Sequence, residues 1–398
     1  MTSTARPLSD APGFPGAGEG GTVPGFRPPP YPYERLGGLR AVAEGIDGGV
    51  VDCSVGTPCD PPYAGALEAL AASGAERGYP SSAGSPAYRR AAADHLRRVF
   101  AVDVDDGALA ACVGTKEMVA STPHYLHLRD PSRDTVLYPS VSYPTYAMGA
   151  RLAGCRAVPV LPAHPDGGGL DLEALDASDI RRALVLWVNS PANPSGALCD
   201  LDAAARWGRA HGVPVFSDEC YAAYTWQGPP RSILQAGVSG VVAVHSVSKR
   251  SNLAGIRAGF FAGDAELVGY LRDVRQHAGL MVPGPVQAAA VAAWGDEGHV
   301  AVQRSRYDER LALLSEALTA AGCPTPLPAG GFYLWPGVPE RWADGWAMAE
   351  DLARVSGMLV SPGDLYGPGG ARHVRIAVVQ PTERLAGVAK RLGQADWR

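Results

Sequence analysis

The chain has 398 residues, a formal net charge of −5 at pH 7 and 46% hydrophobic residues, so we expect two domains with a core each. It has no basic run that would favour nucleic acid or an anionic membrane surface, no apolar stretch long enough to cross a bilayer, and no secretory leader pattern at its start. Its seven cysteines form no CxxC pair, so we expect no metal site and no disulfide framework, and a cytoplasmic location.

Residues 1–30 are rich in Gly, Pro and Ser and predict a disordered tail. From Tyr33 on, helix and strand patterns follow one another. Strands are predicted at 50–55, 108–113, 135–138, 156–161, 184–188, 213–217 and 241–244. Helices are predicted at 33–42, 64–73, 86–100, 114–128, 201–211, 264–277 and 285–318. A further helix is predicted to follow the loop 139–146 and to end at 152. This alternation predicts a mostly parallel sheet covered by helices on both faces.

A smaller α+β domain is predicted towards the carboxyl terminus, where strand patterns at 331–335, 358–360 and 374–379 surround a helix pattern at 344–356. We therefore expect an α/β fold with a three-layer α/β/α large domain over 63–289. The small domain combines 31–62 with 290–398. No GxGxxG follows the first strand, which disfavours a dinucleotide-binding domain.

The stretch 241–261 carries the most distinctive residue. Lys249 follows a buried strand pattern, and the sequence contains only two other lysines, Lys116 and Lys390. Basic surface is built almost wholly from arginine, and an arginine cannot form a Schiff base, so Lys249 is a candidate for amine chemistry. Taken alone, an ordinary turn lysine explains it equally well.

Polar residues also follow the neighbouring strand patterns, and parallel sheets bind ligands at the carboxyl ends of their strands. The residues in question are Gly114 and Thr115, Asn193, Asp218 and Tyr221, and Ser246 with Ser248. Each one alone is explained by a cap or a turn. Together they predict one site with the chemistry that pyridoxal 5′-phosphate (PLP) needs: an amine, a carboxylate for the ring nitrogen, a phenol and an amide for the 3-oxygen, and donors for the phosphate.

The segments SVGTP, GYPSSAG, GTKE, YPSVSYPTY, NSPANPSG, SDECY, HSVSKRSNLAGIRAGF and HVRIA occur in the order and spacing of class I/II aminotransferases of PLP fold type I. The resemblance covers residues 33 to 392 and implies an aspartate-aminotransferase-like fold. Within that group the chain is most similar to actinobacterial N-succinyldiaminopimelate aminotransferases (the DapC type). This resemblance implies an enzyme that moves an amino group from a donor such as glutamate to an oxo acid. The implied oxo acid is N-succinyl-2-amino-6-oxopimelate, in lysine synthesis.

The resemblance also implies residue roles. Lys249 is the Schiff-base lysine and proton shuttle, and Asp218 is the partner of the pyridine nitrogen. Tyr221 and Asn193 hold the 3-oxygen, and Tyr143 stacks on the ring. Gly114, Thr115, Lys116, Ser246, Ser248 and Arg257 surround the phosphate, with Tyr79 entering from the other subunit of a homodimer. Arg375 clamps the substrate carboxylate, helped by the backbone at Gly56.

Two positions depart from the pattern of that subgroup: Ile256 stands in place of a tyrosine, and Gln276 in place of a lysine that would read a distal carboxylate. They leave open an alternative, a PLP enzyme of specialised metabolism that catalyses Cβ or Cγ elimination, replacement or carbon–carbon bond formation. A non-enzymatic effector-binding module is a further alternative. It lacks support in the sequence because no DNA-binding domain pattern precedes the fold.

Overall fold

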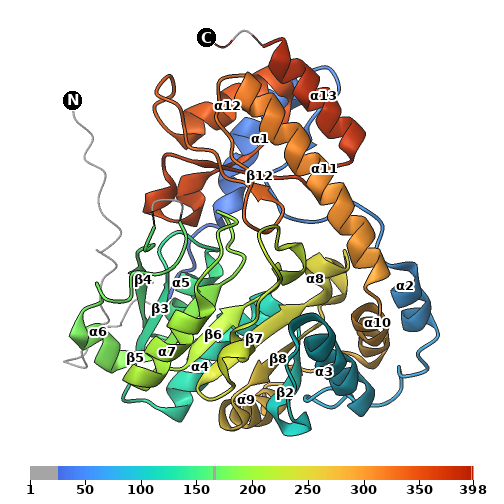
Figure 1. Cartoon of the computed structure of the whole chain (residues 1–398), viewed down its shortest axis with the longest axis vertical. Coiled ribbons are helices and arrows are strands. Elements are labelled where there is room, and N and C mark those ends of the chain that lie inside the picture. Colours follow the sequence, from blue (N-terminus) through green and yellow to red (C-terminus); the bar gives the residue numbers. More distant parts are fainter. Residues whose placement is uncertain (1–25, 165–166, 396, 398) are drawn as a thin grey trace.

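The computed structural model describes residues 26–164, 167–395 and 397. The predicted tail lies outside these residues, except for 26–30, which are exposed and have no regular secondary structure. The described chain folds into a large lower domain and a smaller upper domain (Figure 1).

A seven-stranded sheet forms the centre of the large domain, with the strand order β2-β8-β7-β6-β5-β3-β4. Its strands are β2 (Leu109–Cys112), β3 (Thr135–Pro139), β4 (Arg156–Val160), β5 (Ala183–Asn189), β6 (Val215–Asp218), β7 (Val241–Ser246) and β8 (Gly259–Gly263). The pairs from β7 to β4 are all parallel, and only β8 runs antiparallel to its two neighbours. The mostly parallel sheet is therefore confirmed.

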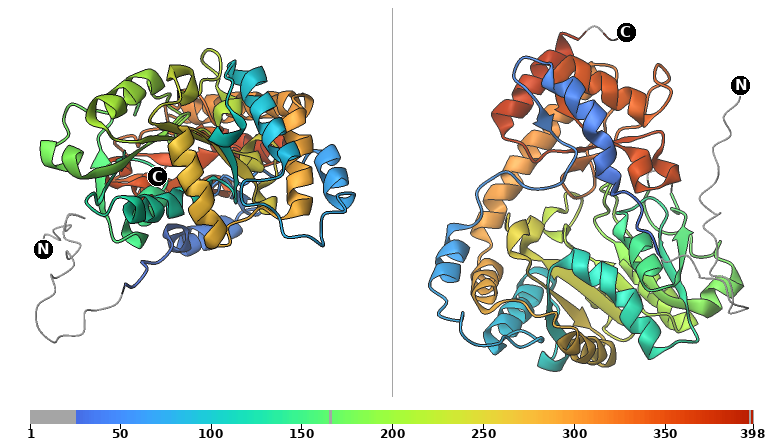
Figure 2. Two further views of the ribbon diagram at one scale, coloured as in Figure 1. Left: turned by 90° about the horizontal axis from the view of Figure 1, so that it is seen from below. Right: turned by 180° about the vertical axis from the view of Figure 1, so that it is seen from behind.

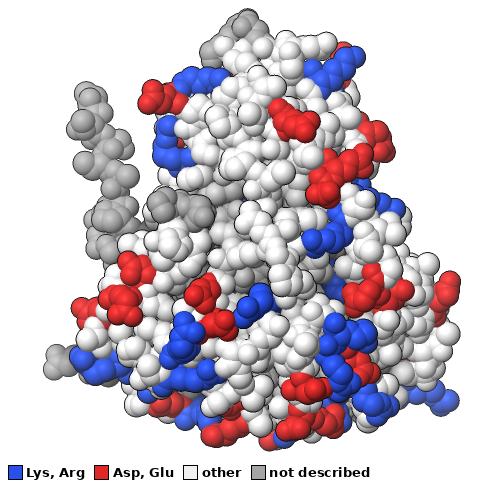
Figure 3. Space-filling model, viewed as in Figure 1, with Lys and Arg blue, Asp and Glu red and all other residues white. Residues whose placement is uncertain are grey.

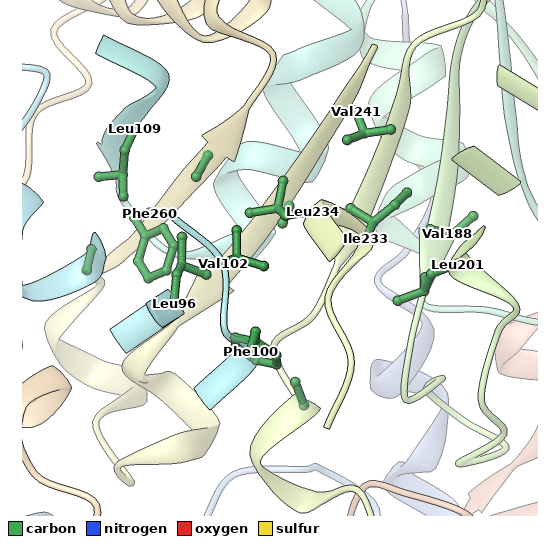
Figure 4. Packing of buried hydrophobic residues seen from close by; sticks show 14 of the residues in the cluster. Leu96, Phe100, Val102, Leu109, Val188, Leu201, Ile233, Leu234, Val241 and Phe260 are labelled. Atoms are coloured by element: carbon green, nitrogen blue, oxygen red, sulfur yellow. The ribbon is translucent and has the colours of Figure 1, made fainter. Parts of the chain in front are cut away.

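Side-chain alternation explains why helices cover both faces of this sheet. On β7, Val241 and Ala243 pack into one core cluster while Val242 and Val244 pack into another. The first cluster takes residues from α3 (Pro86–Phe100), α7 (Leu201–His211) and α10 (Gly284–Gly295), and Figure 4 shows part of it. The second takes residues from α4 (Thr115–Arg129), α5 (Thr145–Leu152) and α9 (Ala265–His277). The result is the predicted α/β/α sandwich, with the sheet between two helix layers (Figures 1 and 2).

Both ends of the described chain contribute to the small domain, whose core is separate from those of the large domain. Its helices are α1 (Gly37–Glu44), α11 (Gly298–Ala320), α12 (Gly345–Ser356) and α13 (Thr382–Gly393). Its strands are β1 (Val51–Asp52) paired with β10 (Met358–Leu359), and β11 (Ser361–Pro362), β12 (Val374–Ala377) and β9 (Tyr333–Leu334) in a second sheet. The remaining short helices of the large domain are α2 (Ala64–Ala71), α6 (Ala177–Arg182) and α8 (Val247–Arg250).

The structure differs from the sequence-based expectation at two elements. The strand expected at 50–55 is a strand only over Val51–Asp52. Backbone hydrogen bonds continue to Cys53, and from Ser54 on the carbonyl accepts from the side chains of Ser361 and Arg375 instead. The helix pattern at 285–318 is two helices, since Asp296 adopts an extended backbone and its carboxylate caps the next helix at the amide of His299.

The expected domain boundary at residue 290 falls inside α10. Ala290, Ala293 and Trp294 of this helix pack in the same core cluster as the large-domain helix α3, so the large domain continues to about Trp294.

No helix within the described ranges is both long and apolar enough to span a membrane. On the face shown in Figure 3 positive and negative side chains are interspersed, and no single-sign patch of the kind that attracts nucleic acid stands out there.

Candidate active site

A pocket of about 350 Å³ opens between the two domains, at the carboxyl ends of β5, β6 and β7. This is the edge at which open parallel sheets bind ligands. Most of the residues that the sequence singled out line it: Gly56, Thr115, Lys116, Tyr143, Asn193, Asp218, Tyr221, Ser248, Lys249, Arg257 and Arg375. Segments more than three hundred residues apart in sequence therefore form one site.

Lys249 lies in the short helix α8, which begins directly after β7. The Ser246 hydroxyl caps this helix by accepting a hydrogen bond from the amide of Ser248, at 3.0 Å. The Lys249 ammonium donates to the carbonyl oxygen of Gly56. Desolvation by burial lowers the pKa of Lys249 to about 8, so a nucleophilic neutral amine is accessible near neutral pH.

Asp218 ends β6 and is buried. Its carboxylate accepts hydrogen bonds from the Tyr146 hydroxyl at 3.1 Å and from the Cys220 amide at 3.2 Å. Burial raises its pKa, and these hydrogen bonds oppose the rise. No cationic side chain of the described residues forms an ion pair with it. A buried carboxylate without a cationic partner is costly in a pocket wall, so it is a candidate to hold a protonated ring nitrogen.

Arg375 presents the opposite charge. It is 2% exposed, donates to the Asn193 side-chain oxygen at 2.8 Å and to the carbonyl oxygen of Ser54, and its Nε has no hydrogen-bond partner. Within the described part of the chain it forms no ion pair with a carboxylate. A buried guanidinium in this state suits bidentate capture of a substrate carboxylate.

A small cradle suited to a phosphate lies at the start of α4. Gly114 has φ +82°, and a Cβ there would come within 2.5 Å of a guanidinium nitrogen of Arg257, so only glycine fits. Thr115 is the first residue of α4, where free backbone N–H groups favour an anion. Arg257 donates to the carbonyls of Ala254 at 2.8 Å and Val113 at 3.1 Å, which orients it towards the cradle.

The mouth of the pocket is aromatic and carries one exposed cation. The Lys116 ammonium lies 4.9 Å from the Tyr31 ring centre and 5.9 Å from that of Tyr143, and it donates to the Tyr31 hydroxyl at 3.3 Å. It forms no ion pair with any described carboxylate. The Lys116 ammonium thus faces Tyr31 and Tyr143, and its expected place beside a phosphate stays a prediction.

Three other expected site residues do not line the pocket. Gly114 packs against the Arg257 guanidinium. The Ser246 hydroxyl donates to the carbonyl of Ala258 at 3.1 Å and lies 2.7 Å from the Ser248 hydroxyl, so it supports Ser248 rather than the pocket itself. Tyr79 is fully exposed in a loop.

The structure also adds residues that the sequence reasoning missed: Tyr31, Tyr33, Tyr146, Asn189 and Tyr333. Tyr146 stands three residues after Tyr143 in the same aromatic motif, and that motif was the available signal. Tyr333 carried no signal. Ile256 and Gln276, the two departures from the subgroup pattern, do not line the pocket. No group of three or more His, Cys, Asp or Glu side chains in the described ranges could hold a metal ion.

Comparison with known proteins agrees with this geometry. Residues 49–392 match the family model for aminotransferase class I and II. The chain is 42% identical to a probable aminotransferase of Mycobacterium tuberculosis, over 92% of this chain and 85% of the relative. It is 41% identical to the 4-dedimethylamino-4-oxo-anhydrotetracycline transaminase of Streptomyces rimosus, over 92% and 99%.

Among solved structures it resembles a probable N-succinyldiaminopimelate aminotransferase of Thermus thermophilus. The TM-score is 0.81 at 31% identity, over 91% of this chain and 99% of that one. With a family model that covers most of the chain and a pocket that holds the family's motifs, the protein belongs to the class I and II aminotransferases.

Proposed function

We propose that this PLP-dependent transaminase moves an amino group from glutamate to an oxo acid with a distal carboxylate, and that N-succinyl-2-amino-6-oxopimelate is the acceptor. The observation that carries the proposal is a pair of cations in one pocket, neither of which forms an ion pair with a carboxylate of the described residues. Arg375 is buried in its wall, and Lys116 lies at its mouth. Arg375 suits the α-carboxylate of a substrate and Lys116 suits a distal carboxylate, and both glutamate and this acceptor carry at least one of each.

The residues present fit PLP. The cofactor requires a partner for its aldehyde, one for its ring nitrogen and one for its phosphate. The pocket offers a buried amine of lowered pKa, a carboxylate without an ion-pair partner, and a glycine-lined cradle beside Arg257. We assign Lys249 to the aldehyde, Asp218 to the ring nitrogen and Tyr143 to the ring face. Gly114, Thr115, Ser248 and Arg257 hold the phosphate, with Ser246 supporting Ser248.

When bound, PLP supplies a carbonyl that exchanges amines and a ring that takes up the electron pair released at the substrate Cα. Arg375 binds the substrate α-carboxylate and is oriented by Asn193, whose side-chain NH₂ remains available for the 3-oxygen together with Tyr221. Lys249 would hold the cofactor's aldehyde, and its amine, once free and neutral, would move the proton between the substrate Cα and the cofactor's 4′-carbon. Asp218 keeps the ring nitrogen protonated throughout.

Two assignments extend beyond the pocket. Tyr79, fully exposed in its own chain, is assigned to the phosphate of the partner's site in a homodimer. A cytoplasmic location is supported by the seven cysteines, all of them free thiols. The elimination and replacement reactions left open by the sequence gain no support, because the matched family and relatives are aminotransferases.

A second acceptor class is a ketone on a flat polycyclic skeleton. Tyr31, Tyr33 and Tyr143 give the pocket mouth aromatic faces on which such a ring system would stack. The Streptomyces rimosus relative is named for an acceptor of this kind.

A panel of amino donors and oxo acceptors, with products identified, tests the proposal. It should include N-succinyl-2-amino-6-oxopimelate, monocarboxylic oxo acids and a polycyclic ketone. Replacing Lys116 by Gln should raise KM for glutamate and for the succinylated acceptor about tenfold, and change KM for alanine little, because one partly exposed charge pair is lost. Lys390→Gln, an exposed lysine of α13, is the matched control. A Lys116→Gln enzyme that still prefers substrates with a distal carboxylate to the same degree would refute the role of Lys116.

A further inference from the structure

We infer that Tyr333 is a positioning residue for Tyr221. Its hydroxyl donates a hydrogen bond to the Tyr221 hydroxyl and makes Tyr221 a stronger donor to the cofactor's 3-oxygen. The inference rests on the role proposed above for Tyr221.

The two tyrosines meet across the domain interface. Tyr221 follows β6 of the large domain, and Tyr333 lies on β9 of the small domain. Their hydroxyl oxygens are 2.8 Å apart, and their rings lie edge to face with centroids 5.5 Å apart. Both side chains are buried, and both line the pocket. The hydrogen bond is therefore part of the pocket wall and sheltered from water.

Proton counting decides the direction of this hydrogen bond. Each hydroxyl has one proton to donate. Within the described chain, neither hydroxyl has another hydrogen-bond partner. If Tyr221 gives its proton to the cofactor's 3-oxygen, the proton between the two oxygens must come from Tyr333. A phenol that accepts one hydrogen bond while donating another is polarised and donates more strongly.

The surroundings of Tyr333 hold its hydroxyl in place. The Arg375 guanidinium lies 4.4 Å from its ring centre. Gly56 also approaches so closely that a Cβ there would lie 2.1 Å from the Tyr333 hydroxyl oxygen. Pairing of β9 with β12 sets the backbone, with Tyr333 opposite Ala377. The side chain therefore contacts both the carboxylate-binding group and the phenol that faces the cofactor.

The measurable consequence is the pH at which the visible absorption of the cofactor-loaded enzyme changes. A donor to the 3-oxygen draws off negative charge that would otherwise stabilise the neighbouring proton on the Lys249 nitrogen, and so lowers that midpoint. Tyr333→Phe keeps the ring against Arg375 and removes only the donor. We expect the midpoint to rise by roughly 0.5 to 1 pH unit, the equivalent of one hydrogen bond.

Tyr307→Phe is the matched control. Tyr307 is a buried tyrosine of the same core cluster whose hydroxyl has no partner, and it does not line the pocket. Its loss should leave the midpoint unchanged. A purely structural effect of removing a buried hydroxyl would shift both variants alike, and that result would overturn the inference.

Tyr221→Phe separates this inference from the proposed function. If Tyr221→Phe leaves the midpoint unchanged, the proposed role of Tyr221 is wrong. If it raises the midpoint while Tyr333→Phe does not, only the role of Tyr333 is wrong. In the double variant, Tyr333→Phe should add nothing to the shift of Tyr221→Phe. A full additional shift would show that Tyr333 acts independently of Tyr221, against the inference.

Discussion

At the scale of single residues, this site is defined by charges that are buried without counter-ions. Asp218 and Arg375 both line the pocket, and neither forms an ion pair within the described chain. Such groups are costly to folding, since an unpaired buried charge loses its hydration. In the proposed function their partners come from what binds: a protonated ring nitrogen for Asp218 and a substrate carboxylate for Arg375.

Tyr146→Phe tests the support of Asp218. The Tyr146 hydroxyl donates to the Asp218 carboxylate and favours its charged form, against the burial that raises its pKa. Without this donor the pKa of Asp218 rises further. As the pH is lowered, the variant should therefore lose activity at a higher pH than the native enzyme does. We expect the acid limb of the kcat/KM profile to move up by about 0.5 to 1 pH unit. Tyr270→Phe, which loses a hydrogen bond to the Tyr125 carbonyl outside the pocket, should leave that limb in place.

The amine of Lys249 gives a second pH dependence. Its folded-state pKa of about 8 lies below that of an unfolded lysine, because burial penalises the ammonium. In the folded protein the charged form therefore prevails only below about pH 8. As pH rises through that value the neutral amine appears. Covalent uptake of PLP by cofactor-free protein, trapped with borohydride, should rise through about pH 8 and then level off. A rate that still climbs towards about pH 10.4, the value of an ordinary lysine, would contradict this.

At the scale of elements, the helix α4 is anchored so that its start can hold an anion. Arg275 of α9 is 1% exposed and binds the Glu117 carboxylate of α4 with two hydrogen bonds of 2.7 Å. Glu117 in turn accepts a hydrogen bond from the amide of Val113, directly after β2. This pair fixes the joint that carries Gly114 and Thr115.

Arg275→Ala should therefore weaken both the fold and the grip on the cofactor phosphate. We expect a loss of about 3 kcal/mol in unfolding free energy, because the Glu117 carboxylate loses its buried partner, together with faster loss of PLP on dialysis. Arg272→Ala on the same helix removes an exposed pair with Asp273 and should cost less than about 0.5 kcal/mol. Equal denaturation midpoints for the two variants would show that the anchor is unimportant.

At the scale of the whole molecule, the proposed homodimer makes each site depend on both subunits. Tyr79 is fully exposed, although an aromatic side chain usually finds cover. A partner subunit would provide that cover and would bring the phenol to a phosphate.

Mixing two inactive variants tests this arrangement. Tyr79→Ala and Lys249→Ala are each expected to lose most activity as pure proteins. When they are co-refolded, about half of the dimers are mixed, and each mixed dimer holds one site with native Tyr79 and Lys249. Activity should recover to about one quarter of the wild-type value. No recovery, with mixed dimers shown to form, would place Tyr79 in its own subunit's structure only.

The sequence by itself determined the order of elements, the sandwich architecture and most of the pocket. These follow from local patterns: alternation on β7, the lysine after it, and polar residues at the ends of neighbouring strands, which a parallel sheet necessarily brings to one edge. The roles expected for the individual site residues came from the family resemblance, because its short, contiguous motifs can be matched residue by residue.

Only the tertiary structure decided which side chains meet across the domain interface. Tyr333 contacts Tyr221 from 112 residues away, and Lys116 contacts Tyr31 from 85 residues away. The domain boundary near Trp294 and the split of α10 from α11 were likewise hidden in a continuous helical pattern. Such contacts depend on how two separately packed cores sit against each other. The periodicity of a helix or strand shows which of its faces is buried. It does not encode how two separately packed domains are placed against each other.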